Sequence, residues 1–562
     1  MSSIAPQPLL AGFGATLLLG LAACSASNDE PAASVVAPPK MKQEVLHEAA
    51  DGNASYAPQP SVAAGSMEAR KAVPQLMPMI APAAPLADSA AFGYQDVYRE
   101  QYQKIESSPV QAVAQQPVST FSIDVDTGAY ANVRRFLNDG SLPPKDAVRL
   151  EELVNYFPYA YPKPEGDVPF SVATELATTP WNPETRLLRV AIKAADLSAA
   201  ELPPANLVFL VDVSGSMDRR EGLPMVQSTL KLLVDQLRPQ DRVALVTYAG
   251  NASVVLESTA GSDKAKIRTA IDQLTAGGST AGESGIQLAY QEAQKGILKG
   301  GINRILLATD GDFNVGISDF ETLKQLAADK RKTGVSLTTL GFGTDNYNEQ
   351  LMEQLADAGD GNYAYIDNLR EARKVLVDQL SSTLAVVAKD VKIQVEFNPA
   401  EVSEYRLLGY ENRALKREDF SNDKVDAGEI GAGHTVTALY EVVPVGAKGW
   451  LEPLRYTQAN EKPGKAGEIA WLRLRYKAPE GGASKLVERP IGKGEATPIT
   501  KASEDLRFAA AVAAVEAWGA CPGASAKTAW LCEVWMDDMV RSFKVHSVFR
   551  WSASVVADLV LR

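Results

Sequence analysis

Cysteine is scarce in this chain, which has only Cys24, Cys521 and Cys532 among its 562 residues. Three cysteines cannot build a disulfide framework or a cysteine-rich metal site. Cys521 and Cys532 could pair in an oxidising compartment, but their separation in sequence does not define the geometry of a disulfide bond. The composition therefore excludes disulfide-stapled folds and cysteine-rich metal modules.

Histidine is equally scarce, with only His47, His434 and His546. They fall in three different parts of the chain, so a Ser/His/Asp catalytic arrangement is hard to assemble. The sequence also lacks the Gly-x4-Gly-Lys-Ser/Thr motif of phosphate-binding loops. These absences favour binding over catalysis.

Positive charge is in deficit: 56 Lys and Arg face 69 Asp and Glu, a formal net charge of -13. Phosphate binding needs basic patches, so this balance argues against a nucleic-acid partner. The length of 562 residues predicts several domains with well-developed cores.

Long hydrophobic runs are missing as well, and the apolar stretch from Leu9 to Ala23 is too short for a comfortable membrane span. It ends in Leu-Ala-Ala-Cys24, which resembles the signal of bacterial lipoproteins, although no Lys or Arg precedes Lys40. We predict a signal peptide over residues 1–24 with lipidation of Cys24; the alternatives are a plain secretory signal and a buried helix.

The lipoprotein resemblance implies a location in the cell envelope. Under the family's sorting rule, Ser25 after the cysteine implies a lipid anchor in the outer membrane, with the protein facing the periplasm or the cell surface. Residues 25–118 are rich in Ala, Pro, Ser and Gln and lack apolar periodicity, which predicts a disordered tether.

Residues 119–200 are expected to form a small N-terminal module. The run from Phe121 to Thr127 predicts a strand that leads into a helix, and helical patterns follow over Ala129–Asn138 and after Pro144. Asp124 and Asp126 are read as turn and helix-cap residues; a phosphotransferase with a nucleophilic aspartate is the alternative, but it lacks a matching lysine and acidic pair.

Alternating apolar and polar residues predict half-buried antiparallel strands both before and after the middle of the chain. They occur within residues 168–197, in Val391–Phe397 and in Leu472–Tyr476. Because the first block alone has too few strands for a sheet, we predict that it pairs with residues 390–480. The middle segment would then be inserted in, or flanked by, a β-sandwich-like domain whose C-terminal part spans 386–514.

The middle segment, residues 201–385, alternates strands and helices and predicts a doubly wound α/β domain with a mostly parallel sheet. The expected strands are Leu207–Val213, Arg242–Ala249, Ala252–Glu257, Arg304–Ala308, Val335–Leu340 and Asn362–Ile366. The expected helices are Leu223–Leu237, Lys264–Leu274, Gly282–Gly296, Phe320–Thr333, Tyr347–Ala358 and Leu369–Leu384.

Oxygen-bearing side chains follow the predicted strands of this segment at their carboxyl ends. Asp212, Ser214 and Ser216 alternate after the first strand, and Thr280 and Asp310 add two further oxygens. Five oxygens without His or Cys suit a hard divalent cation. A helix cap formed by the two serines is the alternative, and the two roles are compatible.

The same five residues carry a family resemblance. The segment resembles a von Willebrand factor type A (VWA) domain with its metal-ion-dependent adhesion site (MIDAS), whose Asp-x-Ser-x-Ser, threonine and aspartate positions match Asp212, Ser214, Ser216, Thr280 and Asp310. The resemblance implies Mg²⁺ or Mn²⁺ at this site and a protein ligand that donates an acidic side chain. It also implies a switch through movement of the last helix.

The resemblance extends over the whole body from Ser119 to Ala514, which is similar to bacterial proteins that combine an N-terminal von Willebrand factor module, a VWA domain and a C-terminal domain of unknown function. Residues 515–562 depart from that pattern and hold four of the seven tryptophans. We interpret this tail as the product of a reading-frame shift near Val515; a genuine helical tail is the alternative.

Two other functions stay open from the sequence. An accessory role for an AAA ATPase or in envelope assembly rests on what some relatives of the VWA domain do. Metal-dependent hydrolysis at Asp212 is chemically feasible because Mg²⁺ can activate water, but no general base is evident beside it.

Overall fold

The central strand of the middle domain is β5, Ala205–Asp212, in which all eight residues are buried. The computed structural model describes residues 100–198, 200–280, 282–311, 320–344, 346–452, 454, 465–494 and 497–519. Of the helices in these ranges, none combines the length and the apolar character that crossing a membrane requires. Cys24, the signal peptide and the tail beyond Gly519 lie outside the described residues.

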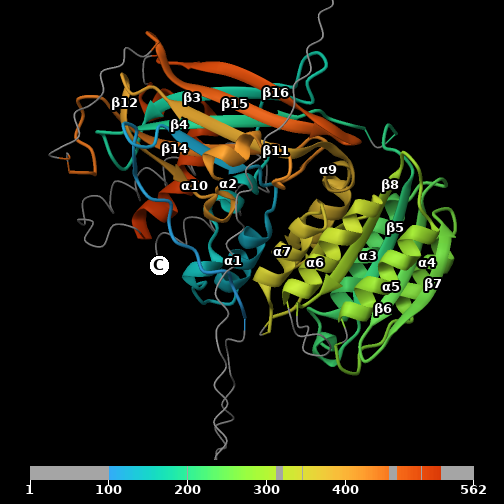
Figure 1. The fold of residues 1–562 in the computed structure, drawn as a ribbon. Helices are drawn as coiled ribbons and strands as arrows, with labels where there is room; N and C mark the ends of the chain where they lie inside the picture. The colour runs from blue at the N-terminus through green and yellow to red at the C-terminus, as the bar shows by residue number, and fades with distance from the viewer. Residues whose placement is uncertain are drawn as a thin grey trace, which may run out of the picture. The chain divides into compact units, whose positions relative to one another are not determined.

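The middle domain contains a six-stranded sheet in the order β10-β9-β8-β5-β6-β7 (Figure 1). All neighbours are parallel except β6 and β7, which are antiparallel. The strands that join β5 are β6 (Arg242–Tyr248), β7 (Ala252–Ala260), β8 (Ile302–Thr309), β9 (Ser336–Gly341) and β10 (Tyr363–Tyr365). The mostly parallel α/β sheet predicted from the sequence is therefore confirmed.

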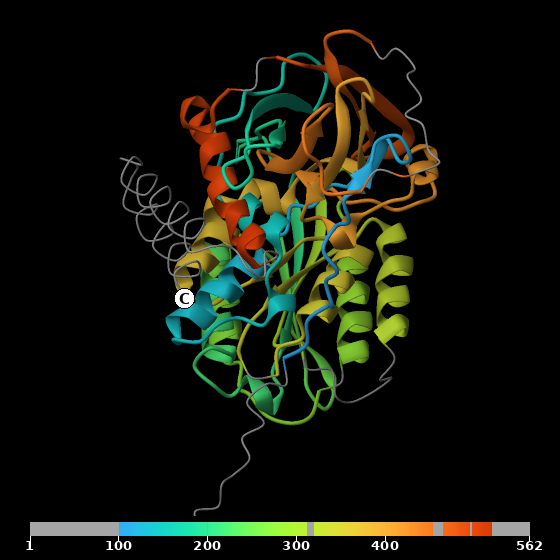
Figure 2. The same ribbon diagram turned by 90° about the vertical axis from the view of Figure 1, so that its left-hand side faces the viewer.

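Helices cover both faces of this sheet, so that the strands lie between two helical layers (Figure 2). Apolar side chains of one face pack against α3 (Leu223–Gln236), α4 (Lys264–Asp272) and α8 (Leu369–Arg373). Those of the other face pack against α5 (Gly282–Lys295), α6 (Phe320–Lys330) and α7 (Glu349–Ala358). Burial on both faces explains why the strands are nearly continuous apolar runs.

Two antiparallel sheets share one core and form the sandwich. The first has the order β1-β12-β14-β4-β3 and the second β13-β11-β15-β16, with β2 on β11. Their bounds are β1 Gln111–Ala112, β2 Val118–Ser122, β3 Phe170–Thr178, β4 Arg186–Ala194, β11 Val386–Phe397, β12 Val402–Leu408, β13 Ile430–Gly431, β14 Thr435–Pro444, β15 Glu468–Ala478 and β16 Gly481–Gly492.

The strands before the middle domain pair with strands after it, as predicted. β4 pairs with β14 from Lys193 opposite Thr435 to Arg186 opposite Val442. The strands predicted at Val391–Phe397 and Leu472–Tyr476 fall within β11 and β15 of the other sheet, so they face β3 and β4 across the core instead of bonding to them. The middle domain is thus inserted between strands of one sandwich.

The N-terminal module packs on the outer face of the first sandwich sheet. Helices α1 (Gly128–Asn138), α2 (Leu150–Asn155) and α10 (Glu504–Gly519) share an apolar cluster with residues of β3, β4 and β14 that face away from the sandwich core. Apart from the start of the folded body, the limits predicted for the separate domains stay predictions.

The structure differs from the sequence interpretation at the start of the folded body. The tether was expected to continue to residue 118, yet Val113 is buried, β1 pairs with β12, and Gln101 forms a bridge with Asn348. Backbone hydrogen bonds hold this segment in place. Because such bonds do not depend on the side chains, the sequence of the segment shows no apolar periodicity that would predict its structure.

The last helix of the middle domain is also different from the single helix expected over Leu369–Leu384. It is divided into α8, a π-helical turn over Lys374–Asp378, and α9 over Leu380–Leu384. π-helical turns commonly interrupt α-helices at functional positions. No second position of this helix is described, so the predicted switch stays a prediction.

Candidate metal centre

The turn after β5 carries the first three predicted ligands. Asp212 and Ser214 are buried, and Ser216 is half-buried. The backbone N–H of Ser214 donates to Oδ1 of Asp212 at 2.8 Å, and the hydroxyls of Ser214 and Ser216 are 3.0 Å apart. The alternate spacing of the motif therefore gathers these oxygens at one point. The serine hydroxyls form no helix cap here, because neither the short 3₁₀ turn at Gly215–Met217 nor α3 has a side-chain cap hydrogen bond.

Two neighbouring strands fix the orientation of Asp212. Its Oδ2 accepts a hydrogen bond of 2.8 Å from the Thr309 hydroxyl at the end of β8 and one of 3.2 Å from the Tyr248 hydroxyl at the end of β6. Sequence analysis identified neither residue as part of the site. Thr309 immediately precedes the predicted ligand Asp310, and this adjacency is the signal in the sequence that points to it.

Thr280 lies on a loop that hydrogen-bonds to the turn after β5. The N–H of Gly277 donates to the Val213 carbonyl at 2.8 Å, and the Gly278 carbonyl accepts from the Gly215 N–H at 3.0 Å. Gly278 has φ +94°, a left-handed conformation that other residues rarely adopt. These bonds hold the loop that carries the buried Thr280 against the turn that carries Ser214 and Ser216.

Asp310 follows β8 and is fully buried. Burial, and then the negative charge of Asp310, raise the pKa of Asp212 from 3.8 to about 6. The negative charges of the two carboxylates disfavour each other, and a cation bound between them would relieve this repulsion. Together with the serine hydroxyls they offer hard oxygen donors, so the residues present fit a hard divalent cation.

Arg219 is a further member of the site that sequence analysis missed. Its Nη2 lies 3.2 Å from Oδ2 of Asp310 and 2.6 Å from Oδ1 of Asn346, while its Nη1 donates to the Thr344 carbonyl at 2.5 Å. Asn346 also donates to Oδ2 of Asp310 at 3.2 Å. A positive side chain therefore contacts one of the five predicted ligands.

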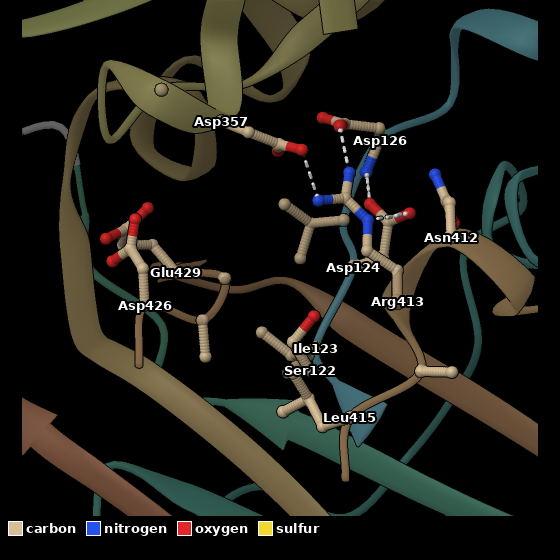
Figure 3. A pocket seen from close by; sticks show the side chains of 15 residues that line it. Ser122, Ile123, Asp124, Asp126, Asp357, Asn412, Arg413, Leu415, Asp426 and Glu429 are labelled. Carbon is tan, nitrogen blue, oxygen red and sulfur yellow. Dashed lines mark hydrogen bonds and ion pairs between the residues drawn. The ribbon is translucent and has the colours of Figure 1, made fainter. Parts of the chain in front are cut away.

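A second group of carboxylates has ligand-like spacing but already holds a cation. Asp124, Asp126 and Glu353 have oxygens within 4.8 Å of one another. Arg413 donates to Asp124 at 3.1 Å, to Asp126 at 3.1 Å and to Glu353 at 3.2 Å, and it also pairs with Asp357 (Figure 3). Arg413 pairs with all four carboxylates, so an ion-pair network already occupies this cluster.

This network corrects the expectation that Asp124 and Asp126 cap a helix. Oδ1 of Asp124 does accept the N–H of Asp126 at 2.8 Å, as a turn residue would. Asp126, however, accepts the N–H of Tyr363 in β10, and the N-cap of α1 is Thr127 without a side-chain cap bond. Both aspartates thus join the N-terminal module to the middle domain and the sandwich.

Comparison with known proteins bears on all three parts of the chain. Residues 206–379 match the model of the von Willebrand factor type A domain, residues 96–189 the model named von Willebrand factor, and residues 382–520 the model of the C-terminal region of the uncharacterized protein YfbK. The uncharacterized protein YfbK of Escherichia coli (strain K12) is 54% identical over 422 residues, which cover 74% of this chain and 73% of YfbK. The chain belongs to the YfbK family.

Other relatives of this YfbK-family chain share less of it. The uncharacterized protein sll0103 of Synechocystis sp. (strain ATCC 27184 / PCC 6803 / Kazusa) is 36% identical over 188 residues, 33% of this chain and 43% of that protein. The solved structure of von Willebrand factor type A from Catenulispora acidiphila has 15% sequence identity and a TM-score of 0.38, and covers 70% of this chain and 96% of its own.

Proposed function

We propose that this protein is a divalent-metal-dependent protein-binding lipoprotein of the bacterial envelope. In this proposal Asp212, Ser214, Ser216, Thr280 and Asp310 hold Mg²⁺ or Mn²⁺, and an acidic side chain of a partner protein completes the coordination. The observation that carries the proposal is the hydrogen-bonded gathering of Asp212, Ser214 and Ser216 at the end of β5, beside the carboxylate of Asp310.

The donor set explains why the cation would bind a partner. Hydroxyls are neutral, so only Asp212 and Asp310 offset the two positive charges of the ion. Serine and threonine ligands thus leave the ion less neutralised than an all-carboxylate site would, and a hard cation keeps exchangeable positions for external oxygen ligands. A carboxylate from a partner supplies both the oxygen and the charge.

The neighbouring groups favour binding over hydrolysis. Thr309, Tyr248 and the Ser214 N–H all donate to Asp212, so they orient the carboxylate and do not take up a proton. Burial raises the pKa of Tyr248 well above its ordinary value, so its hydroxyl stays protonated. We therefore propose a non-catalytic role for the site.

The proposed anchor is the lipid at Cys24, with the outer membrane as the membrane that holds it. Metabolic labelling with a radioactive fatty acid tests this part separately. The wild-type protein is expected to take up the label and the Cys24→Ala variant is not. Equal labelling of the two proteins would remove Cys24 from the proposal.

Capture of partner proteins tests the binding function. Wild-type protein immobilised with Mg²⁺ is expected to retain a partner that EDTA releases, and the Asp212→Ala variant is expected to retain none. Asp218→Ala is a matched control because Asp218 is an exposed aspartate on the same turn. Retention that is insensitive both to EDTA and to Asp212→Ala would contradict the proposal.

A further inference from the structure

Arg219 occupies a position beside the candidate metal that the five-residue motif does not specify. Its guanidinium contacts the carboxylate of Asp310 and the amide oxygen of Asn346, and its side chain is 22% exposed whereas that of Asp310 is fully buried. One end of the arginine therefore touches a predicted ligand, while part of the side chain is exposed to solvent.

The segment after β9 holds the guanidinium in this position. The Thr344 carbonyl accepts from Nη1, and a Cβ built on Gly343 would lie 3.3 Å from Nε. Gly343 has φ +77°, a backbone conformation in which any side chain would be strained. Glycine at this position lets the backbone lie directly against the guanidinium of Arg219. Arg219 is thus a fixed charge instead of a flexible surface arginine.

The charge of Arg219 has opposite consequences for the two binding events at this site. The two negative charges of Asp212 and Asp310 balance the two positive charges of a divalent cation. Arg219 therefore gives the metal-loaded site a net positive charge. It repels the metal and shares the Asp310 carboxylate with it, which weakens metal binding. The same charge attracts an anionic group that approaches the bound metal.

We propose that Arg219 is the residue that makes the metal-loaded site select a carboxylate ligand, at the expense of metal affinity. This inference rests on the proposed function, because it requires a metal at Asp212 and Asp310. It goes further in assigning ligand selectivity to a residue outside the metal-binding motif. A purely structural Arg219 would lower both affinities when replaced, so the opposite signs are the signature of the selectivity role.

Binding of Mn²⁺ to the full chain, followed by electron paramagnetic resonance of the free ion, measures the first effect. Arg219→Gln is expected to bind Mn²⁺ about fivefold more tightly than wild type at low ionic strength. Arg220→Gln removes the same charge from the next residue, which is exposed, and is expected to change the affinity by less than about twofold.

The second effect is measured with a short peptide that contains one glutamate and is otherwise uncharged, against its glutamine counterpart, at saturating Mn²⁺. Wild type is expected to bind the glutamate peptide, Arg219→Gln about tenfold more weakly, and Arg219→Lys in between because it keeps the charge without the planar fork. The glutamine peptide is expected to bind none of them measurably.

Three results would overturn the inference: unchanged or weaker Mn²⁺ binding by Arg219→Gln, equal peptide affinity in Arg219→Gln and wild type, or no preference of metal-loaded wild type for the glutamate peptide. Failure of the proposed function is recognised separately. It appears as Mn²⁺ binding that Asp212→Ala leaves intact, whatever Arg219→Gln does.

Discussion

The hydroxyl of Thr309 donates a hydrogen bond of 2.8 Å to Oδ2 of Asp212. The two residues lie at the carboxyl ends of the adjacent parallel strands β8 and β5. Thr309 also accepts the backbone N–H of Gly311 at 3.0 Å. One buried hydroxyl therefore joins the first candidate ligand to the turn that carries Asp310.

Replacement of Thr309 by valine tests this connection. Thr309→Val keeps the shape of the side chain but leaves Asp212 less firmly oriented, and loss of an outer-shell partner of this kind typically lowers metal affinity about 10- to 100-fold. Isothermal titration with Mn²⁺ measures the change.

Thr339→Val is the matched control, because Thr339 is equally buried in β9 and donates to the Met352 carbonyl at 2.8 Å. Both variants are expected to lose about 1–3 kcal/mol of unfolding free energy. Only Thr309→Val should lose metal affinity; equal metal binding by the two variants would show that Thr309 plays no part in the site.

Close packing of α5 on β6 also bears on the site. A Cβ on Gly285 would lie 2.8 Å from Cβ of Tyr248, whose hydroxyl reaches Asp212. Gly285→Ala is expected to displace Tyr248, to cost about 1–3 kcal/mol of stability and to weaken Mn²⁺ binding several-fold. Tyr248→Phe removes the hydroxyl alone. If Gly285→Ala acts through Tyr248, the double variant Gly285→Ala/Tyr248→Phe is expected to bind Mn²⁺ as tightly as the single variant that has the lower affinity. Losses of affinity that add up in the double variant would show that Gly285→Ala acts by another mechanism.

Arg413 stabilises the junction between three parts of the chain. It follows β12 of the sandwich and pairs with Asp126 of the N-terminal module and with Glu353 and Asp357 of α7. Arg413→Met takes this cation from Asp126 and Asp357, whereas Glu353 keeps its pair with Arg149, and the variant is expected to destabilise the protein by about 3–5 kcal/mol in urea unfolding. Arg268→Met, which breaks an exposed pair with Asp235, should cost less than about 1 kcal/mol. Similar costs for the two variants would contradict the assignment.

Glu151 makes stability depend on pH. Burial, followed by the charge of Glu411, raises its pKa from 4.5 to about 7, and its Oε2 has no hydrogen-bond partner among the described residues. The folded state therefore binds this proton more tightly than the unfolded state, so the contribution is fully present below about pH 4.5 and is lost as pH rises through about 7.

Glu151→Gln removes that proton requirement. The variant is expected to match wild type near pH 4 and to exceed its unfolding free energy by up to about 3 kcal/mol near pH 8. Urea unfolding at both pH values measures the difference. Glu184→Gln makes the same change at an exposed position and should follow the wild-type profile. A constant offset between Glu151→Gln and wild type would show that the pKa of Glu151 is the same in the folded and unfolded states.

The middle domain could be predicted from sequence because both faces of its sheet are buried, so that its central strands consist almost entirely of apolar residues. β5 shows it most clearly: its apolar run from Leu207 to Val211 ends directly at Asp212. Turn residues and helical periodicity then separate the remaining strands, and the motif itself places the ligands at strand ends.

The polar contacts around the site could not be predicted in the same way. Arg219 meets Asp310 across 91 residues, and Arg413 meets Asp124 across 289. Periodicity reports which face of an element is buried but not which charges meet once the chain has folded. Asp124 lies in a segment whose sequence predicts a strand that leads into a helix, and nothing in that pattern identifies Arg413 as its partner. Their pairing becomes visible only in three dimensions.

Equilibrium binding of Mn²⁺ to the full-length wild-type protein and to Asp212→Ala, with circular dichroism of both, tests the central claim most directly. The account predicts saturable binding by wild type and by Asp218→Ala, and at least about 100-fold weaker binding by Asp212→Ala with an unchanged spectrum. Binding of Mn²⁺ by Asp212→Ala with wild-type affinity and stoichiometry would contradict it.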